Sequence, residues 1–183
     1  MKVAKFGGTS LANAAQIRKV IDIVRSDPSR RIVVVSAPGK RARDDVKVTD
    51  MLIALALKCL DHGAAEGELA AVVGRYAEIQ RELGLAAAIV RDIESDLRSR
   101  MAGDRTSRDI FTDSLKAAGE DNCARLVAAA FCAQGVDARY LSPKDAGLLL
   151  SAEPGNALVL EESYPNLQRA LSAMKGIVIF PGF

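Results

Sequence analysis

The sequence contains no tryptophan, and aromatic residues make up only 4% of its 183 residues. The formal net charge is +2, so charge of neither sign dominates. Proteins that bind nucleic acid usually carry a basic stripe, and those that bind single strands add aromatic side chains on which bases stack. Because both features are lacking, nucleic acid is not expected as a partner.

Histidine and cysteine are also scarce. His62 is the only histidine, which leaves no imidazole-based metal site, and beside Gly63 it is interpreted as a surface residue near a helix end. Cys59, Cys123 and Cys132 lack the CxxC spacing of zinc and redox sites and fall within helical apolar patterns. They are predicted to be buried free thiols rather than disulfides or zinc ligands.

Long apolar runs are missing as well. None reaches the length of about 18 residues that spans a bilayer, and the first residues lack the apolar stretch of a signal peptide. A cytoplasmic protein without a membrane partner is therefore expected. With 49% hydrophobic residues, the chain is long enough for one domain that buries roughly 70% of its unfolded surface.

Apolar residues are arranged as in an α/β sandwich. The continuous, β-branched runs at 32–35 and 177–180 are typical of strands covered on both faces of a parallel sheet. Helical spacing follows the first two strands, at Ile17, Val20, Ile21 and Val24 and again at Val48, Met51, Leu52, Leu55 and Cys59. Strand, helix, strand, helix is the opening order of such a fold.

The middle of the chain, residues 63–135, keeps a helical pattern and is interpreted as a helical insertion between strands. Residues 104–109 provide helix-start signals, and Gly119 is predicted to separate that helix from the next. A short strand at 136–141, a Pro/Gly loop at 151–156 and a last helix at 165–174 are then expected before the final strand.

The most informative motif is Lys5-Phe6-Gly7-Gly8-Thr9-Ser10, in which a short strand runs into a glycine pair. Glycines lack a Cβ, so backbone N–H groups can approach phosphate oxygens, and the helix expected to start near 11–13 would point its positive end at the same place. Lys5 adds a full charge. A glycine pair alone is more often an ordinary turn, but these flanking residues favour phosphate binding.

Four further segments follow in order: Val33-Val34-Val35-Ser36-Ala37, Lys47-Val48-Thr49-Asp50, Ala118-Gly119-Glu120 and Pro181-Gly182-Phe183. Together with the glycine motif they resemble the aspartate kinases of the amino acid kinase family. The resemblance covers the whole chain but ends part-way through the family's catalytic domain. Ser36-Ala37-Pro38-Gly39-Lys40-Arg41, with Asp44-Asp45, is similar to one subgroup of these enzymes.

The resemblance implies a three-layer αβα sandwich with a mainly parallel sheet, in which residues 1–183 form the N-terminal, amino-acid-binding part of the kinase domain. It implies ATP-dependent phosphorylation of the side-chain carboxylate of L-aspartate to 4-phospho-L-aspartate, the first step toward lysine, threonine and methionine. ATP with Mg²⁺ and L-aspartate are the small molecules expected, and the full-length protein is expected to be a homo-oligomer.

The same resemblance assigns roles to individual residues. Lys5 would stabilise the transferring phosphoryl group. The phosphates would be lined by Lys5, Gly7, Gly8, Thr9, Ser10 and Ser36. L-Aspartate would be held by Thr49, by Glu120 against its α-ammonium group, and by Phe183. No protein metal ligand is expected.

Plainer structural interpretations remain open for several of these residues. Thr9 and Ser10 would also suit the cap of the next helix, Ser36 a turn, and Thr49 the cap of the helix it opens. Glu120 would suit the first turn of a helix. The mixed charges at 40–47 are interpreted as a solvated loop or, second, as a lid over the acceptor site.

The family's Arg-Gly-Gly-Ser-Asp-like loop, adenine pocket and regulatory domains have no counterpart in this sequence. Little or no kinase activity is therefore expected from the chain alone. Two alternatives stay open: a related kinase acting on glutamate or acetylglutamate, and a non-catalytic module for amino acid binding or dimerisation. If the strand at 177–180 is an uncovered edge, the chain is also expected to self-associate.

Overall fold

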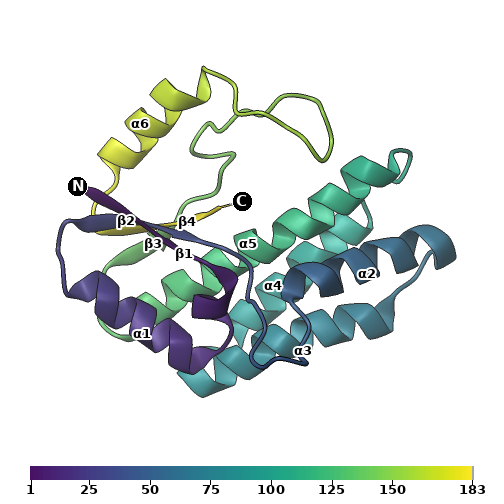
Figure 1. The fold of residues 1–183 in the computed structure, drawn as a ribbon, viewed down its shortest axis with the longest axis horizontal. Coiled ribbons are helices and arrows are strands. Elements are labelled where there is room, and N and C mark those ends of the chain that lie inside the picture. The colour runs from purple at the N-terminus through teal and green to yellow at the C-terminus, as the bar shows by residue number, and fades with distance from the viewer. Residues whose placement is uncertain (183) are drawn as a thin grey trace.

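A computed structural model describes residues 1–182 as a parallel four-stranded sheet between two layers of helices (Figure 1). The strands are β1 (Lys2–Phe6), β2 (Arg30–Val35), β3 (Ala138–Tyr140) and β4 (Ile177–Pro181), in the spatial order β1-β2-β4-β3. Each neighbouring pair is parallel. The predicted α/β class and its three layers are confirmed.

The helices lie on both faces because the crossovers between strands run in two opposite directions across the sheet. Helix α1 (Ala14–Arg25) leads from β1 inward to β2, and α6 (Ser163–Ala173) leads from the edge strand β3 inward to β4. Crossovers between parallel strands are right-handed in nearly all proteins, so opposite directions put the two helices on opposite faces. Figure 1 shows α6 above the sheet and α1 below it.

The predicted helical insertion is confirmed between β2 and β3. It comprises α2 (Val48–His62), α3 (Glu66–Leu83), α4 (Ala88–Met101) and α5 (Arg108–Ala133). Of these, α5 runs beneath the sheet and also packs against α2 and α4 (Figure 1). Its length lets it connect the sheet to the other helices of the insertion.

The prediction that Gly119 ends a helix is wrong, because α5 continues through it. A Cβ at Gly119 would lie 2.8 Å from the Cβ of Ala37 and 3.1 Å from Cδ1 of Leu52. The glycine therefore allows α5 to pass close to the loop after β2 and to α2. Close packing selects glycine here, and its modest helix propensity is tolerated because the helix is held by tertiary contacts.

The main core lies below the sheet. Val33 and Val35 of β2 and Ile179 of β4 are fully buried against the helical layer. On the upper face Ile32 and Val178 are also buried, whereas Val3 of β1 is 63% exposed. The central strands are therefore covered on both faces, as their continuous apolar sequences predict.

Two further expectations are corrected. Strand β4 lies between β2 and β3, so it is not an edge, and the expected self-association through it loses its basis. Cys59 and Cys123 are buried as predicted, but Cys132 is exposed near the C-terminal end of α5. His62 ends α2 at the surface, as predicted.

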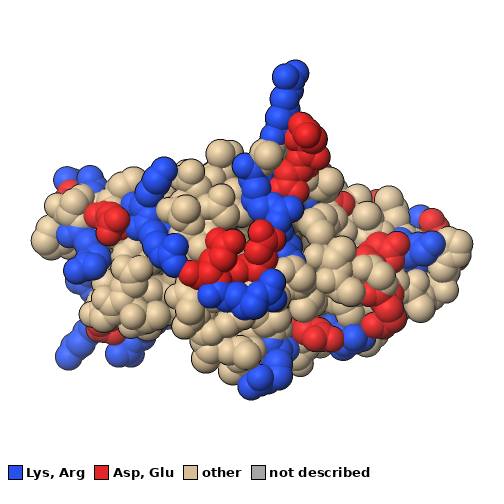
Figure 2. All heavy atoms as spheres, turned by 90° about the horizontal axis from the view of Figure 1, so that it is seen from below, with Lys and Arg blue, Asp and Glu red and all other residues tan. Residues whose placement is uncertain are grey.

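Acidic and basic side chains alternate over the lower face of the molecule, where Figure 2 shows no continuous patch of one sign. Within residues 1–182, no helix combines the length and apolar character that a bilayer span requires.

A buried tyrosine connects helices α3 and α5 of the insertion. Tyr76 of α3 is 1% exposed, and its hydroxyl donates a hydrogen bond of 2.9 Å to the carbonyl of Gly119 in α5. We predict that Tyr76→Phe lowers the free energy of unfolding by about 1 kcal/mol in urea denaturation, the usual net contribution of such a bond. The matched change Tyr164→Phe, at a 64% exposed tyrosine, should have almost no effect. Equal losses would contradict the prediction.

Candidate functional site

A cavity of about 330 Å³ opens where the first two strands end. Backbone and side chains from the loops after β1 and β2, the start of α2 and the middle of α5 form its walls. The lining residues are Gly8, Thr9, Ser36, Ala37, Pro38, Gly39, Lys40, Lys47, Thr49 and Glu120. Five residues predicted from the sequence, Gly8, Thr9, Ser36, Thr49 and Glu120, are thus brought together.

Other predicted residues lie outside this lining. Lys5 is exposed on β1 and pairs in register with Val34. Since side chains alternate along a strand and Phe6 packs into the core, Lys5 lies on the opposite, upper face of the sheet. Gly7 and Ser10 flank the lining residues in the chain but are not among them. Phe183 lies outside the described residues.

Two glycines allow the loops after β1 and β2 to touch through their backbones. The amide of Gly39 donates a 2.8 Å hydrogen bond to the carbonyl of Gly8. A Cβ at Gly8 would lie 2.8 Å from the carbonyl oxygen of Ala37, and one at Gly39 would lie 2.6 Å from the carbonyl carbon of Gly8. Any side chain would therefore separate the two loops that form this wall of the cavity.

The capping interpretations of the hydroxyl residues are wrong. Thr9 and Ser10 lie in a single 3₁₀ turn, Gly8–Leu11, and α1 begins only at Ala14. Asn13 caps α1, because its Oδ1 accepts a 3.0 Å hydrogen bond from the amide of Gln16. Helix α1 therefore starts at the end of the expected range, with Asn13 as its N-cap.

Thr49 does lie in the first turn of α2, as predicted, but Lys47 occupies the N-cap position and no side-chain capping bond forms there. Thr49 lines the cavity instead of closing the helix end. The sequence thus predicted the position of Thr49 in the helix correctly, but it did not distinguish a capping role from a binding role.

Glu120 is the acidic residue of the cavity. It lies in the middle of α5, so its interpretation as a first-turn residue is wrong. Its Oε1 accepts a 3.3 Å hydrogen bond from the amide of Ala37, across from the loop after β2. Burial raises the pKa of the Glu120 carboxyl above its usual range. A cationic group entering the cavity would meet a carboxylate with little solvent around it.

Two lysines of the cavity were not selected from the sequence. Lys40 and Lys47 both line it, although they belong to the mixed-charge segment interpreted as a solvated loop. All residues of that segment except Asp45 are exposed, as predicted, but Arg41 pairs with Asp45 and with Glu78 of α3. Only the folded loop shows that two cations of this segment face the cavity.

The sequence matches the model of the amino acid kinase family over residues 1–183. The chain belongs to the amino acid kinase family. Among curated proteins, it is 54% identical over its whole length to Aspartokinase 3 of Bacillus subtilis, of which it covers 40%. The resemblance to the aspartate kinases is thus confirmed.

Solved structures agree in fold. The chain aligns with Escherichia coli aspartokinase III in complex with aspartate and ADP (TM-score 0.78, 24% identity) and with the same enzyme in complex with lysine and aspartate (TM-score 0.73, 26% identity). Each alignment covers 99% of this chain and 40% of that one. The chain therefore spans about 40% of the length of these aspartokinases.

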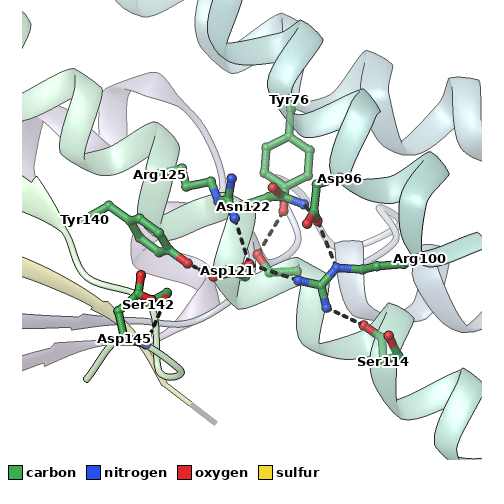
Figure 3. A network of polar contacts seen from close by, with 11 residues as sticks. Tyr76, Asp96, Arg100, Ser114, Asp121, Asn122, Arg125, Tyr140, Ser142 and Asp145 are labelled. Carbon is green, nitrogen blue, oxygen red and sulfur yellow. Dashed lines mark hydrogen bonds and ion pairs between the residues drawn. The ribbon is translucent and has the colours of Figure 1, made fainter. Parts of the chain in front are cut away.

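In this family member, a polar network supports the stretch of α5 that carries Glu120 (Figure 3). Asp121, the next residue, accepts a 2.9 Å hydrogen bond from Arg100 of α4 and another from the hydroxyl of Tyr140 in β3. Arg100 also bonds to Asp96 at 2.9 Å. The buried carboxylate of Asp121 thus joins α5 to α4 and to the sheet, which restrains the position of Glu120.

The residues of the cavity do not form a metal site. Across residues 1–182, no group of three or more acidic, histidine or cysteine side chains is placed to hold a metal ion. Glu120 is the one carboxylate that lines the cavity within that range. A magnesium ion at this site would therefore depend on the phosphates of a nucleotide, which commonly supply most of its ligands.

The contact between the two loops gives a direct prediction. Gly39→Ala should lower the free energy of unfolding by about 1 to 3 kcal/mol, since its Cβ overlaps the backbone of Gly8. Gly7→Ala is the matched control, because a Cβ there meets nothing within 4 Å, and its effect should stay within about 0.5 kcal/mol. Urea denaturation measures both. A neutral Gly39→Ala would show that the loops are not in contact.

The raised pKa of Glu120 predicts a pH-dependent stability. The folded chain holds this proton more tightly than the unfolded chain, so the ionised carboxylate destabilises the fold at neutral pH, and this cost vanishes below the ordinary glutamate pKa of about 4.3. Glu120→Gln should therefore melt at a higher temperature than the parent near pH 7, with the difference shrinking toward pH 4. Glu153→Gln, at an exposed loop position, should show no such trend.

Proposed function

We propose that this chain is the amino-acid-binding part of an aspartate kinase, which transfers the γ-phosphoryl group of ATP to the side-chain carboxylate of L-aspartate. The products are 4-phospho-L-aspartate and ADP. The observation that carries the proposal is a single cavity that contains one half-buried carboxylate, two lysines and three hydroxyl residues. A dicarboxylic amino acid carries the complementary charges: one ammonium group and two carboxylates.

The charges suggest how L-aspartate is held. Glu120 suits the α-ammonium group, because an ammonium close to it would favour the ionised form that burial disfavours. Thr49 offers a hydroxyl and the free N–H groups of the first turn of α2 to a carboxylate. Lys47, at the N-cap of the same helix, adds a positive charge. The complex of E. coli aspartokinase III with aspartate, 26% identical, supports this ligand.

The phosphoryl group would approach from the side of the glycine motif. Gly7, Gly8, Thr9, Ser10 and Ser36 surround the end of β1 and β2, and Lys5 precedes them on the upper face of the sheet. In the proposed reaction Lys5 stabilises the charge of the transferring phosphoryl group, an effect typically worth a factor of about 10²–10³ in rate. Its exposed side chain leaves room for a donor above the sheet.

Phosphoryl transfer requires little covalent chemistry from the protein. An aspartate carboxylate oxygen attacks the γ-phosphorus, the bond to the bridging oxygen of ADP breaks, and no proton need be removed from the acceptor at neutral pH. Catalysis then rests on alignment and charge neutralisation. Mg²⁺ bound by ATP would neutralise part of the phosphate charge. The role of this chain is to orient the acceptor and, through Lys5, to stabilise the charge of the transferring group.

Other parts of the proposal concern the whole protein. ATP-dependent activity, a homo-oligomeric state and a cytoplasmic location are expected for the full-length enzyme, and the aspartokinase relatives support the first of these. Residues 1–183 by themselves are proposed to bind the amino acid with little or no turnover. Phe183 is proposed to pack against the bound aspartate.

Calorimetric titration of the chain with L-aspartate, L-glutamate and Mg-ATP tests the proposal. We predict one aspartate site, with glutamate bound at least about tenfold more weakly because one additional methylene shifts its carboxylate. Glu120→Gln should weaken aspartate binding at least about tenfold through loss of the charged partner. Asp50→Asn, at an exposed carboxylate beside Thr49, is the matched control and should bind as the parent does.

Each other outcome would reject part of the proposal. A preference for glutamate would indicate a different acceptor, and binding of neither amino acid would reject the site. A coupled assay of aspartate-dependent ADP release completes the test: an enzyme-like rate from residues 1–183 alone would contradict the expected lack of turnover.

A further inference from the structure

Arg75 of α3 is a buried arginine, and one of its contacts is to Gly39 in the lining of the cavity. Its side chain is 3% exposed, and it is not among the residues that line the cavity. Lys, Arg, Asp and Glu are almost never this buried unless they are paired, because removing a charge from water is costly. A guanidinium in this position therefore requires partners inside the protein.

Its partners come from the two loops that form the cavity wall. Nη2 of Arg75 donates a 2.6 Å hydrogen bond to the carbonyl of Gly39 and a longer one, of 3.5 Å, to the carbonyl of Ala12. Nη1 forms a 2.7 Å ion pair with Asp45, which lies near the end of the loop after β2. A single planar group thus binds the segment after β1 and both ends of the loop after β2.

The loops themselves are well suited to such a clamp. Gly39 bonds directly to Gly8, and the carbonyl of Pro38 accepts a 3.1 Å hydrogen bond from the amide of Val48 at the start of α2. Ala37 and Pro38 are buried at the start of this loop, whereas residues 40–44 are exposed, so the position of that outer part depends on polar contacts. Asp45 is itself held by Arg41, whose guanidinium keeps the pKa of that carboxyl well below its usual range.

We propose that Arg75 is the positioning residue of the cavity, whose buried guanidinium holds the loop after β1 and the loop after β2 at the separation that the substrate requires. The proposal rests on the proposed function only for the identity of that substrate. Arg75 touches neither substrate nor the reacting atoms. It acts through Gly39, Ala12 and Asp45, and its effect should appear as a change in loop order and binding geometry.

Backbone amide exchange of the chain tests the clamp without any ligand. In Arg75→Met, the amide of Gly39 should exchange at least about tenfold faster than in the parent, while amides of β2 and β4 change by less than about threefold. A purely structural role would instead accelerate exchange in the strands to a similar extent. The matched control is Arg81→Met, at an exposed arginine of the same helix, which should leave Gly39 unchanged.

The second readout is aspartate binding. Calorimetry of Arg75→Met should show about tenfold weaker affinity with the stoichiometry kept at one site per chain, because the site is folded but misplaced. A stoichiometry that falls with unchanged affinity would mean a loss of folded protein and would overturn the proposal. Glu78→Gln, which breaks only the exposed pair of Arg41 with α3, should retain the parent affinity.

Arg75→Lys keeps the test decisive if the methionine variant does not fold. A lysine can still pair with Asp45, but one ammonium cannot also bond to the carbonyls on both loops in the arginine's geometry. Gly39 exchange should therefore remain faster than in the parent. Parent-like exchange and affinity in Arg75→Lys would overturn the proposal. If the parent chain binds no aspartate, the proposed function fails, while the exchange of Gly39 still decides whether Arg75 is a clamp.

Discussion

The cavity depends on the direct backbone contact between two loops at Gly8 and Gly39. Their hydrogen bond holds the loops after β1 and β2 closer together than any side chain would permit. Adjacent parallel strands already place their carboxyl ends side by side, and in open α/β sheets this edge is where ligands bind. The loop contact turns that general position into a walled cavity with a defined set of donors.

The long helix α5 provides another wall, beside the start of α2, and the only carboxylate of the described cavity. It can do so because Gly119 lets it approach Ala37, which brings the neighbouring Glu120 within hydrogen-bond distance of the same loop. Because α5 lies so close to this loop, the carboxylate of Glu120 is partly desolvated and its pKa is raised. A ligand ammonium would offset that cost, so the arrangement favours binding over the stability of the empty chain. Such a conflict is common at functional sites.

Much of the fold followed from local patterns. The buried strands at 32–35 and 177–180, the helices after the first two strands and the helical insertion could all be predicted, because apolar periodicity reflects which face of an element is covered. The break predicted at Gly119 was wrong for a different reason. In a local sequence window, a glycine within a helical pattern indicates a helix end. Here Gly119 instead allows close packing against Ala37, a residue far away in the chain. The exposure of Cys132 likewise depends on which side of α5 meets the sheet.

The candidate site divides in a similar way. Gly8, Thr9, Ser36, Thr49 and Glu120 could be selected as functional residues because their motifs match a family in order along the chain. Lys40 and Lys47 could not be distinguished from a solvated charge cluster, and Arg75 gave no local signal, since an arginine on a helix is ordinarily a surface residue.

The sequence by itself determined the family, the α/β class and the segments that carry phosphate-binding and acidic residues, because these are properties of short stretches and their order. Only the tertiary structure decided which side chains share a cavity, that Lys5 lies on the other face of the sheet from the core, and that Arg75 joins the two loops. These features depend on contacts between residues far apart in the chain, and such contacts cannot be predicted from the spacing of residues within a short segment.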